Sequence, residues 1–296
     1  MIKEIVVISG KGGTGKTSIT AAFATLAKNI VVADCDVDAA DLHLVLSPQI
    51  ERTEDFTGGK CARIEPGLCM GCGKCESICR FEAVSLNGPA NDLIAKTYLI
   101  DPTECEGCGV CAKFCPTDAI VMEDDVSGQW FVSRTHVGPM VHAKLKAGGE
   151  NSGKLVTLIR NESRSIAESV GADIVLTDGP PGTGCPVIAS LTGASMAVIV
   201  TEPTMSGVHD LKRVAELVEY FKIPASLIIN KCDINSDKSD EIAGFAESHN
   251  IEMLGRLPYD PDVTKAQIAG MSITQYSDNN ISRLIRDIWG QLEHKE

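Results

Sequence analysis

Eight residues near the start of the chain have the spacing of a phosphate-binding loop. They read Gly10-Lys11-Gly12-Gly13-Thr14-Gly15-Lys16-Thr17, and Ser18 follows. Glycines at these positions let backbone N–H groups point toward phosphate oxygens, while a lysine placed like Lys16 reaches the β- and γ-phosphates. The next hydroxyl, that of Thr17, is suited to bind Mg²⁺. The segment therefore predicts a nucleoside triphosphate site that uses Gly10 to Ser18.

Eight of the twelve cysteines form a second group with its own chemistry. They fall into two runs of the form C-x2-C-x2-C-x3-C, namely Cys69, Cys72, Cys75 and Cys79, then Cys105, Cys108, Cys111 and Cys115. This spacing places three thiolates around one iron–sulfur cube and sends the fourth to the other cube. It predicts two [4Fe–4S] clusters, one held by Cys69, Cys72, Cys75 and Cys115 and one by Cys105, Cys108, Cys111 and Cys79. Zinc is the alternative, but two such runs are more typical of iron–sulfur proteins.

The other four cysteines have no comparable spacing. We expect Cys35, Cys61, Cys185 and Cys232 to be small buried thiols rather than ligands, because no second ligand accompanies any of them.

The segments that must position these residues alternate between strand and helix patterns. Apolar, β-branched runs predict strands over 5–8, 30–33, 173–178, 197–201 and 225–229, and helical periodicity follows over 18–26, 154–170 and 206–221. The alternation predicts an α/β fold, with a doubly wound, mainly parallel sheet. Asp36 and Asp178 come at or just after the ends of two such strands, which is the ligand edge of a parallel sheet.

The cysteine-rich text from residue 60 to 124 is an internal duplication. Ile64-Glu65-Pro66 and Ile100-Asp101-Pro102 align at an offset of 36 residues, and both cysteine runs align at the same offset. The segment resembles a bacterial two-cluster ferredoxin, which implies a small α+β domain. We expect it to be inserted, through a glycine-containing linker at 55–60, into a larger domain made of residues 1–59 and 125–296.

Charge and hydropathy restrict the partners. The net charge of -13 opposes extensive binding to nucleic acid backbones. No apolar run is long enough to span a membrane, and the first strand begins within a few residues of the N-terminus, so we expect a cytoplasmic protein without a signal peptide. A final helix bears an apolar stripe at Ile281, Leu284, Ile285, Ile288, Trp289 and Leu292. Acids beside the stripe oppose an anionic membrane, so we expect the stripe to pack on the sheet.

Lys11, directly after the first glycine of the loop, makes the segment resemble the deviant Walker A motif of the MinD/ParA class, which includes the nitrogenase iron protein and the Mrp carriers. The resemblance implies a homodimer around two ATP molecules, with Lys11 reaching the partner's nucleotide. It also implies that Asp36 orients the attacking water, that Asp178 holds the Mg²⁺ water shell, and that Gly182 senses the γ-phosphate.

The same resemblance places Asn230 and Pro258 at the adenine. Together the motifs imply an ATPase that uses ATP/ADP and Mg²⁺ and couples its nucleotide state to electron transfer, through two [4Fe–4S] clusters, toward a redox partner protein. The alternative is an iron–sulfur cluster carrier that delivers its clusters to an acceptor, although the C-terminal CxxC of Mrp proteins is absent here. A MinD-like positional role at membranes is a third reading.

Overall fold

The computed structural model describes residues 2–146, 152–293 and 295, and its chain divides into two compact units. Unit 1 comprises Met1–Glu54, Trp130–Lys144 and Ser152–Glu296, and unit 2 comprises Asp55–Gln129 and Leu145–Asn151. The chain leaves unit 1 within strand β3 (Gln49–Ile64) and returns within strand β6 (Ile120–Arg134). Each of these two strands therefore contributes residues to both units.

The segment expected to be a linker, residues 55–60, is instead part of β3. β3 and β6 are neighbours in the sheet, and the Gln129 side chain donates a hydrogen bond of 2.9 Å to Asp55. Pairing with a neighbouring strand thus holds even Gly58 and Gly59 extended, which their local preference does not favour.

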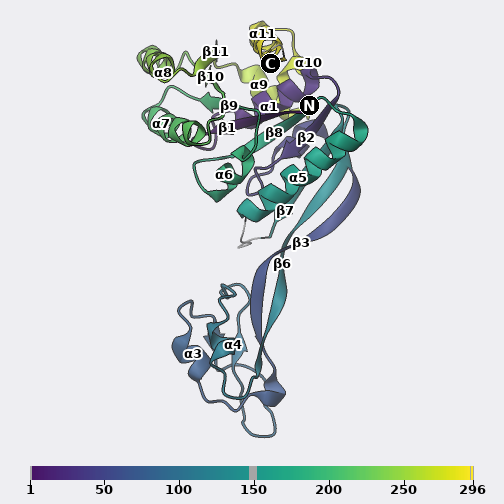
Figure 1. Ribbon diagram of the computed structural model, residues 1–296, viewed down its shortest axis with the longest axis vertical. Helices are drawn as coiled ribbons and strands as arrows, with labels where there is room; N and C mark the ends of the chain where they lie inside the picture. Colours follow the sequence, from purple (N-terminus) through teal and green to yellow (C-terminus); the bar gives the residue numbers. More distant parts are fainter. Residues whose placement is uncertain (1, 147–151, 294, 296) are drawn as a thin grey trace. The chain divides into compact units, whose positions relative to one another are not determined.

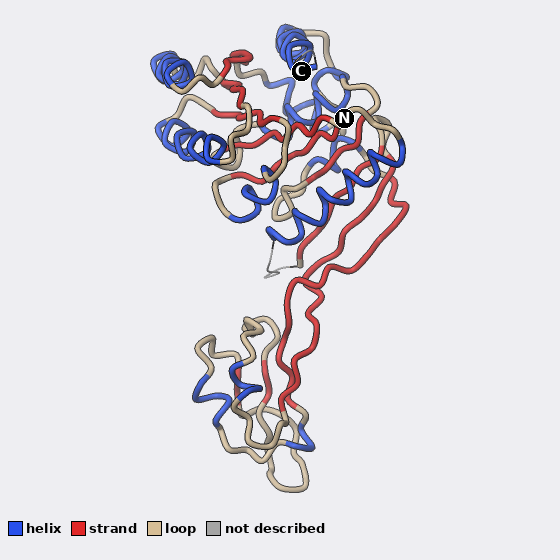
Figure 2. The backbone as a smooth tube through the Cα atoms, in the orientation of Figure 1, coloured by secondary structure: helices blue, strands red, loops and turns tan. Residues whose placement is uncertain are grey.

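Unit 1 is organised by a mainly parallel sheet, as expected. In the described residues the sheet has nine strands in the order β11-β10-β9-β1-β8-β2-β7-β6-β3, and those from β11 to β7 pair in parallel. The parallel strands are β1 (Lys3–Ser9), β2 (Ile30–Asp34), β7 (Pro139–Leu145), β8 (Ile174–Pro181), β9 (Met196–Thr201), β10 (Ala225–Asn230) and β11 (Glu252–Leu257). Figure 2 shows these strands in red between helices.

Two hydrophobic cores cover the two faces of the sheet. Side chains alternate along β1, so that Ile5 and Val7 enter one core and Val6 and Ile8 the other. The first core is closed by α1 (Lys16–Leu26), α2 (Leu42–Leu46), α9 (Pro261–Ile268), α10 (Ile273–Tyr276) and α11 (Asn280–Glu293). The second is closed by α6 (Cys185–Leu191), α7 (Met205–Tyr220) and α8 (Ser236–Ser248), and α5 (Ser152–Val170) contacts α6 (Figure 1). The sheet is therefore doubly wound, as predicted.

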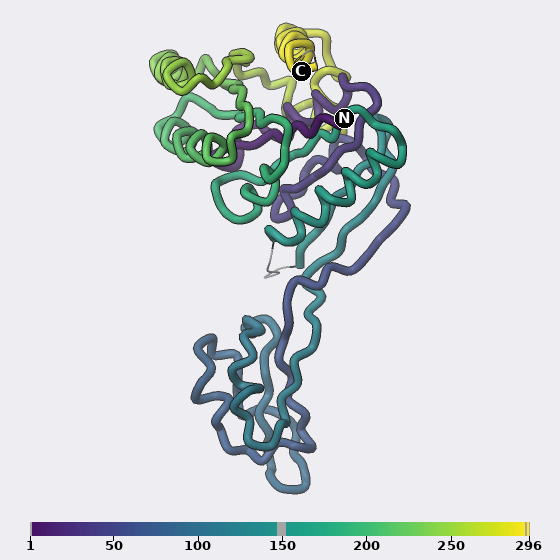
Figure 3. Tube along the Cα trace, in the orientation of Figure 1, coloured from purple at the N-terminus to yellow at the C-terminus, as the bar shows by residue number. Residues whose placement is uncertain are grey.

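The apolar stripe of the last helix, α11, belongs to the first core. Ile281, Ile285, Ile288 and Leu292 are buried, and the Trp289 ring lies 5.3 Å from that of Phe23 on α1. In Figure 3 the yellow α11 lies beside the purple N-terminal helix that it contacts. The stripe is thus used for packing within unit 1. Nowhere in the described residues is a helix both long and apolar enough to cross a membrane.

Unit 2 repeats one small motif twice. Its elements are the 3-10 helix η1 (Pro66–Leu68), α3 (Lys74–Ile78), β4 (Val84–Ser85), β5 (Leu99–Ile100) and α4 (Val110–Lys113), with β4 and β5 antiparallel. Helices α3 and α4 each follow a glycine in the left-handed conformation, Gly73 and Gly109, which are related by the sequence offset. Ile64, Val84, Ile100 and Ile120 form its core together with several cysteines.

Candidate functional site

The glycine loop joins the central strand β1 to the N-terminus of α1. Gly15 precedes the helix with φ of 88°, and a Cβ on it would lie 2.3 Å from the side-chain nitrogen of Asn230. Both features restrict this position to glycine. Gly10, at the start of the loop, lies against Asp210 of α7. The loop is therefore fixed between β1, α7 and β10, with the N-terminus of α1 at its end.

A cavity of about 420 Å³ opens beside this loop, within the range of roughly 300–1,000 Å³ typical of small-molecule sites. Several predicted residues line it, namely Gly12, Gly13, Thr14, Gly15, Lys16, Thr17, Ser18, Asp36, Asn230 and Pro258. Tyr259 and Ile285 add apolar surface at its wall. Gly10, Lys11, Asp178 and Gly182 were predicted for the same site but do not line this cavity.

Lys16 is buried in the wall of the cavity and is paired with carboxylates. Its Nζ lies 2.8 Å from Oδ1 of Asp178 and 3.3 Å from Oδ2 of Asp36. Burial alone would lower the pKa of Lys16, but the two carboxylates outweigh it and hold that pKa above its ordinary value. Lys16 is therefore a charged ammonium at the bottom of the site.

Two hydroxyl groups of α1 bind the same carboxylate. Thr17 donates to Oδ2 of Asp178 at 2.8 Å, and Thr20 donates to Oδ1 at 2.9 Å. Asp178 is fully buried within β8, which continues to Pro181, and its carboxylate thus fixes the first turn of α1 to the central part of the sheet. Thr20 was not among the predicted residues, although it is one helical turn after Lys16.

Asp34 is a further carboxylate that sequence reasoning missed. It ends β2 opposite Asp178 of β8 and is fully buried. Its Oδ1 accepts the backbone N–H of Asp36 at 3.2 Å, but its Oδ2 has no hydrogen-bond partner among the described residues. Burial, and then the charge of Asp178, raise the pKa of Asp34 well above its ordinary value.

Three carboxylates and one ammonium leave this end of the site short of positive charge. Burial raises the pKa of Asp36 as well, although Lys16 opposes that effect. The unpartnered Oδ2 of Asp34, the carboxylate of Asp178 and the hydroxyl of Thr17 are hard oxygen donors, which suit Mg²⁺. The residues present therefore fit a divalent cation bound with a phosphate.

Part of the cavity wall is formed by the loops after β10 and β11. The Asn230 amide donates to the carbonyl of Thr14 at 2.7 Å, and Lys231 donates to the carbonyl of Gly13 at 3.0 Å. The backbone N–H of Tyr259 donates to Asp233 at 2.7 Å, which joins the two loops. The loop after β10 thus holds the glycine loop, and both loops line the cavity.

Lys11 points to the end of β9 and the start of α7. Its Nζ lies 2.6 Å from Oε1 of Glu202 and donates to the hydroxyls of Thr204 and Ser206 at 3.2 and 2.9 Å. Burial acts to raise the pKa of Glu202, but hydrogen bonds from Lys11 and Lys231 outweigh it and lower that pKa. Glu202 is not among the predicted site residues.

Gly182 follows β8 in the left-handed conformation, with φ of 93°, and its N–H donates to the carbonyl of Ser9 at 2.8 Å. This bond joins the loop after β8 to the end of β1. Cys185, a few residues later at the start of α6, is exposed, so the expectation that it is buried was wrong. An N-terminal position on a helix after this loop leaves its side chain outside both cores. Cys35 is buried as expected, whereas Cys61 and Cys232 are partly exposed.

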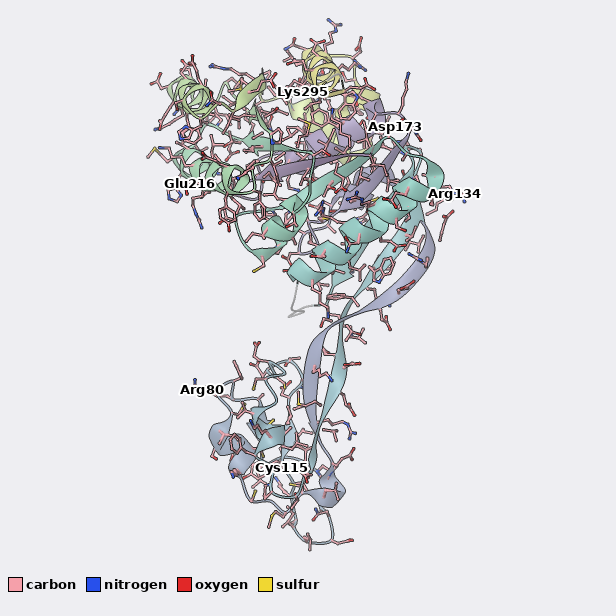
Figure 4. All side chains as sticks on the ribbon, in the orientation of Figure 1. Arg80, Cys115, Arg134, Asp173, Glu216 and Lys295 are labelled. Carbon is pink, nitrogen blue, oxygen red and sulfur yellow. The ribbon has the colours of Figure 1, made fainter. Side chains whose placement is uncertain are left out.

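In unit 2 the eight spaced cysteines line two separate pockets. One pocket is lined by Cys69, Cys72, Cys75 and Cys115, and the other by Cys79, Cys105, Cys108 and Cys111. Figure 4 labels Cys115, which comes from the second repeat and completes the pocket of the first. All eight are free thiols in the structure.

The donor set of each pocket can be compared with the needs of a metal centre. No group of three or more His, Cys, Asp or Glu side chains among the described residues is arranged around a single metal ion. A [4Fe–4S] cube instead distributes four thiolates over four iron atoms, so it needs four cysteines around a cavity. Each pocket has these four cysteines, and the N–H of Ala62 donates to the sulfur of Cys105 at 3.5 Å, as cluster ligands commonly require. The residues fit such a group.

The doubly wound parallel sheet, the glycine loop between β1 and α1 and the paired carboxylates of Asp34 on β2 and Asp178 on β8 define a nucleotide-binding α/β protein of the P-loop class. Residues 5–273 match the CobQ/CobB/MinD/ParA nucleotide binding domain family, and the chain belongs to that family. This agrees with the resemblance carried by Lys11 and Lys16.

Similar proteins extend over nearly the whole chain. An uncharacterized protein of Methanocaldococcus jannaschii is 31% identical, over 99% of this chain and 97% of its own. The iron–sulfur cluster carrier protein of Pyrococcus horikoshii is 22% identical, over 99% of this chain and 86% of its own. The septum site-determining protein MinD of Pyrococcus horikoshii, solved with Mg-ADP, shares the fold with a TM-score of 0.60 at 14% identity, over 99% and 97% of the two chains.

Proposed function

We propose that this chain is an ATPase that acts as a homodimer and couples its nucleotide state to electron transfer through two [4Fe–4S] clusters in unit 2. The observation that carries the proposal is the division of eight cysteines between two pockets, each completed by a cysteine of the other repeat. A protein that binds nucleotide in one unit and holds two redox centres in the other has the parts required for nucleotide-gated electron transfer.

In unit 1 the chemistry is phosphoryl transfer to water. Lys16 exchanges its carboxylate partners for the β- and γ-phosphates, where its charge stabilises the transferring phosphoryl group. Thr17 and Asp178 hold Mg²⁺, and Asp36 positions the attacking water. MinD of Pyrococcus horikoshii was solved with Mg-ADP, which supports this assignment in a protein of the same fold.

The remaining nucleotide contacts follow from the walls of the cavity and the family. Asn230 and Pro258 line the same cavity as Lys16, and there they contact the adenine. Gly182 responds to the γ-phosphate through the loop after β8. Lys11 gives up its hydrogen bonds within its own chain and contacts the partner's ATP, so that the dimer tightens around two nucleotides.

In unit 2 the clusters are held by Cys69, Cys72, Cys75 and Cys115 and by Cys79, Cys105, Cys108 and Cys111. When bound they supply one-electron carriers. In each pocket one cysteine, Cys72 or Cys108, is exposed, whereas the others are buried or half-buried. Ligands drawn from both repeats favour retention of the clusters, which suits electron transfer to a partner protein.

The test is redox potentiometry on anaerobically purified protein. A coupling free energy of about 1 to 3 kcal/mol between the nucleotide site and the clusters shifts a one-electron potential by roughly 40 to 130 mV. We expect midpoint potentials to differ between protein with ADP and protein with a slowly hydrolysed ATP analogue. Equal potentials with no nucleotide, with ADP and with the analogue would contradict the coupling.

A second candidate is an iron–sulfur cluster carrier, which the carrier proteins of Pyrococcus species among its relatives favour. It predicts that clusters move quantitatively to an apo-ferredoxin and are lost rapidly to a chelator. The electron-transfer proposal predicts retention in both assays. One experiment with radiolabelled iron therefore separates the two functions.

A further inference from the structure

The ammonium of Lys11 is fully bonded within its own chain. It has three N–H donors, and three oxygen atoms surround it: a carboxylate oxygen of Glu202 at 2.6 Å and the hydroxyls of Ser206 and Thr204 at 2.9 and 3.2 Å. The side chain of Lys11 is 29% exposed and does not line the nucleotide cavity, unlike the residues from Gly12 to Ser18. To contact any other anion, Lys11 must give up these bonds.

Glu202 is the charged member of this set and binds a second lysine. Its Oε2 lies 3.0 Å from Nζ of Lys231, which also donates to the carbonyl of Gly13 in the glycine loop. The Glu202 side chain is only 12% exposed, at the end of β9. Charge-assisted hydrogen bonds of this kind are roughly twice as strong as neutral ones. Glu202 therefore holds Lys11 more firmly than the two hydroxyls do.

We propose that Glu202 is a positioning residue that retains Lys11 on its own chain and so sets how tightly the ATP-bound dimer forms. The inference rests on the proposed function, in which Lys11 contacts the partner's nucleotide. Each protomer must release one Lys11 from Glu202, so the cost of release enters the dimerisation equilibrium twice. A weaker hold on Lys11 gives a tighter dimer.

The experiment compares Glu202→Gln with a matched control. Gln keeps the size of the side chain but removes the charge that binds Lys11. Glu216→Gln removes the same charge from an exposed position of α7, labelled in Figure 4. Sedimentation velocity measures the dimer Kd of each protein with a slowly hydrolysed ATP analogue and with ADP, and a fluorescent ADP titration measures nucleotide binding separately.

We expect Glu202→Gln to lower the dimer Kd at least tenfold with the ATP analogue and to leave it unchanged with ADP, whereas Glu216→Gln matches the wild type. In a Lys11→Met background, Glu202→Gln should have no further effect, because the residue it releases is gone. Such a cycle distinguishes retention of Lys11 from a general change in the loop.

An equal or weaker dimer for Glu202→Gln than for Glu216→Gln overturns the inference, and so does a failure of both wild type and variant to dimerise although both bind nucleotide. A wild type that stays monomeric while Glu202→Gln dimerises supports it. If the titration shows that wild-type protein binds no nucleotide, the proposed function itself fails.

Discussion

Lys16 and Asp178 form a buried ion pair, with 2.8 Å between Nζ and Oδ1, that joins the first residue of α1 to the central part of the sheet. Asp178 is fully buried, and Lys16 is the ammonium that it shares with Asp36. The lysine that we propose binds phosphate therefore also neutralises Asp178, proposed to hold Mg²⁺, and Asp36, proposed to position water. Both roles can be separated experimentally.

Lys16→Met should abolish nucleotide binding and also destabilise the fold. Removing one partner of a buried ion pair leaves the other charge uncompensated, at a cost of about 3–5 kcal/mol. The loss should be smaller at acid pH, because burial raises the pKa of Asp36 and its protonation removes one of the unpaired charges. Urea unfolding at pH 5 and pH 8 measures it, with exposed Lys212→Met as the control. A variant that binds ADP within threefold of the wild type would contradict the role of Lys16.

Asp34→Asn should stabilise the protein in EDTA while weakening its response to Mg²⁺. Burial and Asp178 raise the pKa of Asp34 in the folded state, so its contribution to stability is full below the ordinary value of 3.8 and is lost as pH rises through the raised value. Asparagine does not titrate, so we expect a gain of about 1–3 kcal/mol at pH 8 and a smaller gain at pH 5.

Denaturation in urea with EDTA measures the gain for Asp34→Asn, and titration with Mg²⁺ and ADP measures the loss of cation binding. Asp38→Asn, at an exposed position of the neighbouring loop, serves as the control. A gain that is independent of pH would argue against an ionised Asp34 as its cause.

The cysteine pockets make a prediction about pairs of substitutions. Cys69→Ser and Cys115→Ser should each lower the iron content from about eight atoms per chain to about four, because both cysteines line the same pocket. Combining them should cause no further loss, whereas Cys69→Ser with Cys79→Ser should remove nearly all the iron. Iron analysis and electron paramagnetic resonance provide the measurement. If Cys69→Ser and Cys115→Ser were additive, the two cysteines would not bind the same cluster, and the assignment of ligands would be wrong.

Gly107→Ala should disturb the second pocket more than Gly109→Ala does. Both residues have positive φ, which costs about 1–2 kcal/mol for alanine, but a Cβ on Gly107 would also lie 1.9 Å from the carbonyl oxygen of Lys60. For Gly109 the nearest atom, the sulfur of Met122, is 4.0 Å away. Unfolding free energies and iron retention should rank the variants in this order. Equal effects would mean that β3 shifts readily to make room for the added Cβ at residue 107.

The parts of the site that are contiguous in sequence were predictable, and those created by strand pairing were not. The glycine loop consists of eight successive residues whose types and spacing predict its function. Its place between β1 and α1 follows from the apolar runs beside it. Asp34 depends on lying opposite Asp178 across two parallel strands, a register that no local pattern specifies. The role of Glu202 likewise depends on its contacts with Lys11 and Lys231, which are distant in sequence.

The same distinction applies to the fold. The alternation of strands and helices indicated the doubly wound sheet, because burial on both faces leaves continuous apolar runs. Gly58 and Gly59 favour a linker over residues 55–60, yet the strand beside them keeps them extended. Exposure of Cys185 depends on the direction in which α6 leaves the loop after β8, which composition does not encode.

The exchange of one cysteine between the two repeats has a consequence for the order of events on the ribosome. The first pocket begins with Cys69 but lacks its last wall until Cys115 has been synthesised, and the second is complete only once Cys111 has been added. Neither half of the duplication therefore forms a complete pocket by itself. Under the proposed function, cluster loading awaits the synthesis of both repeats, and deletion of either one disables both pockets.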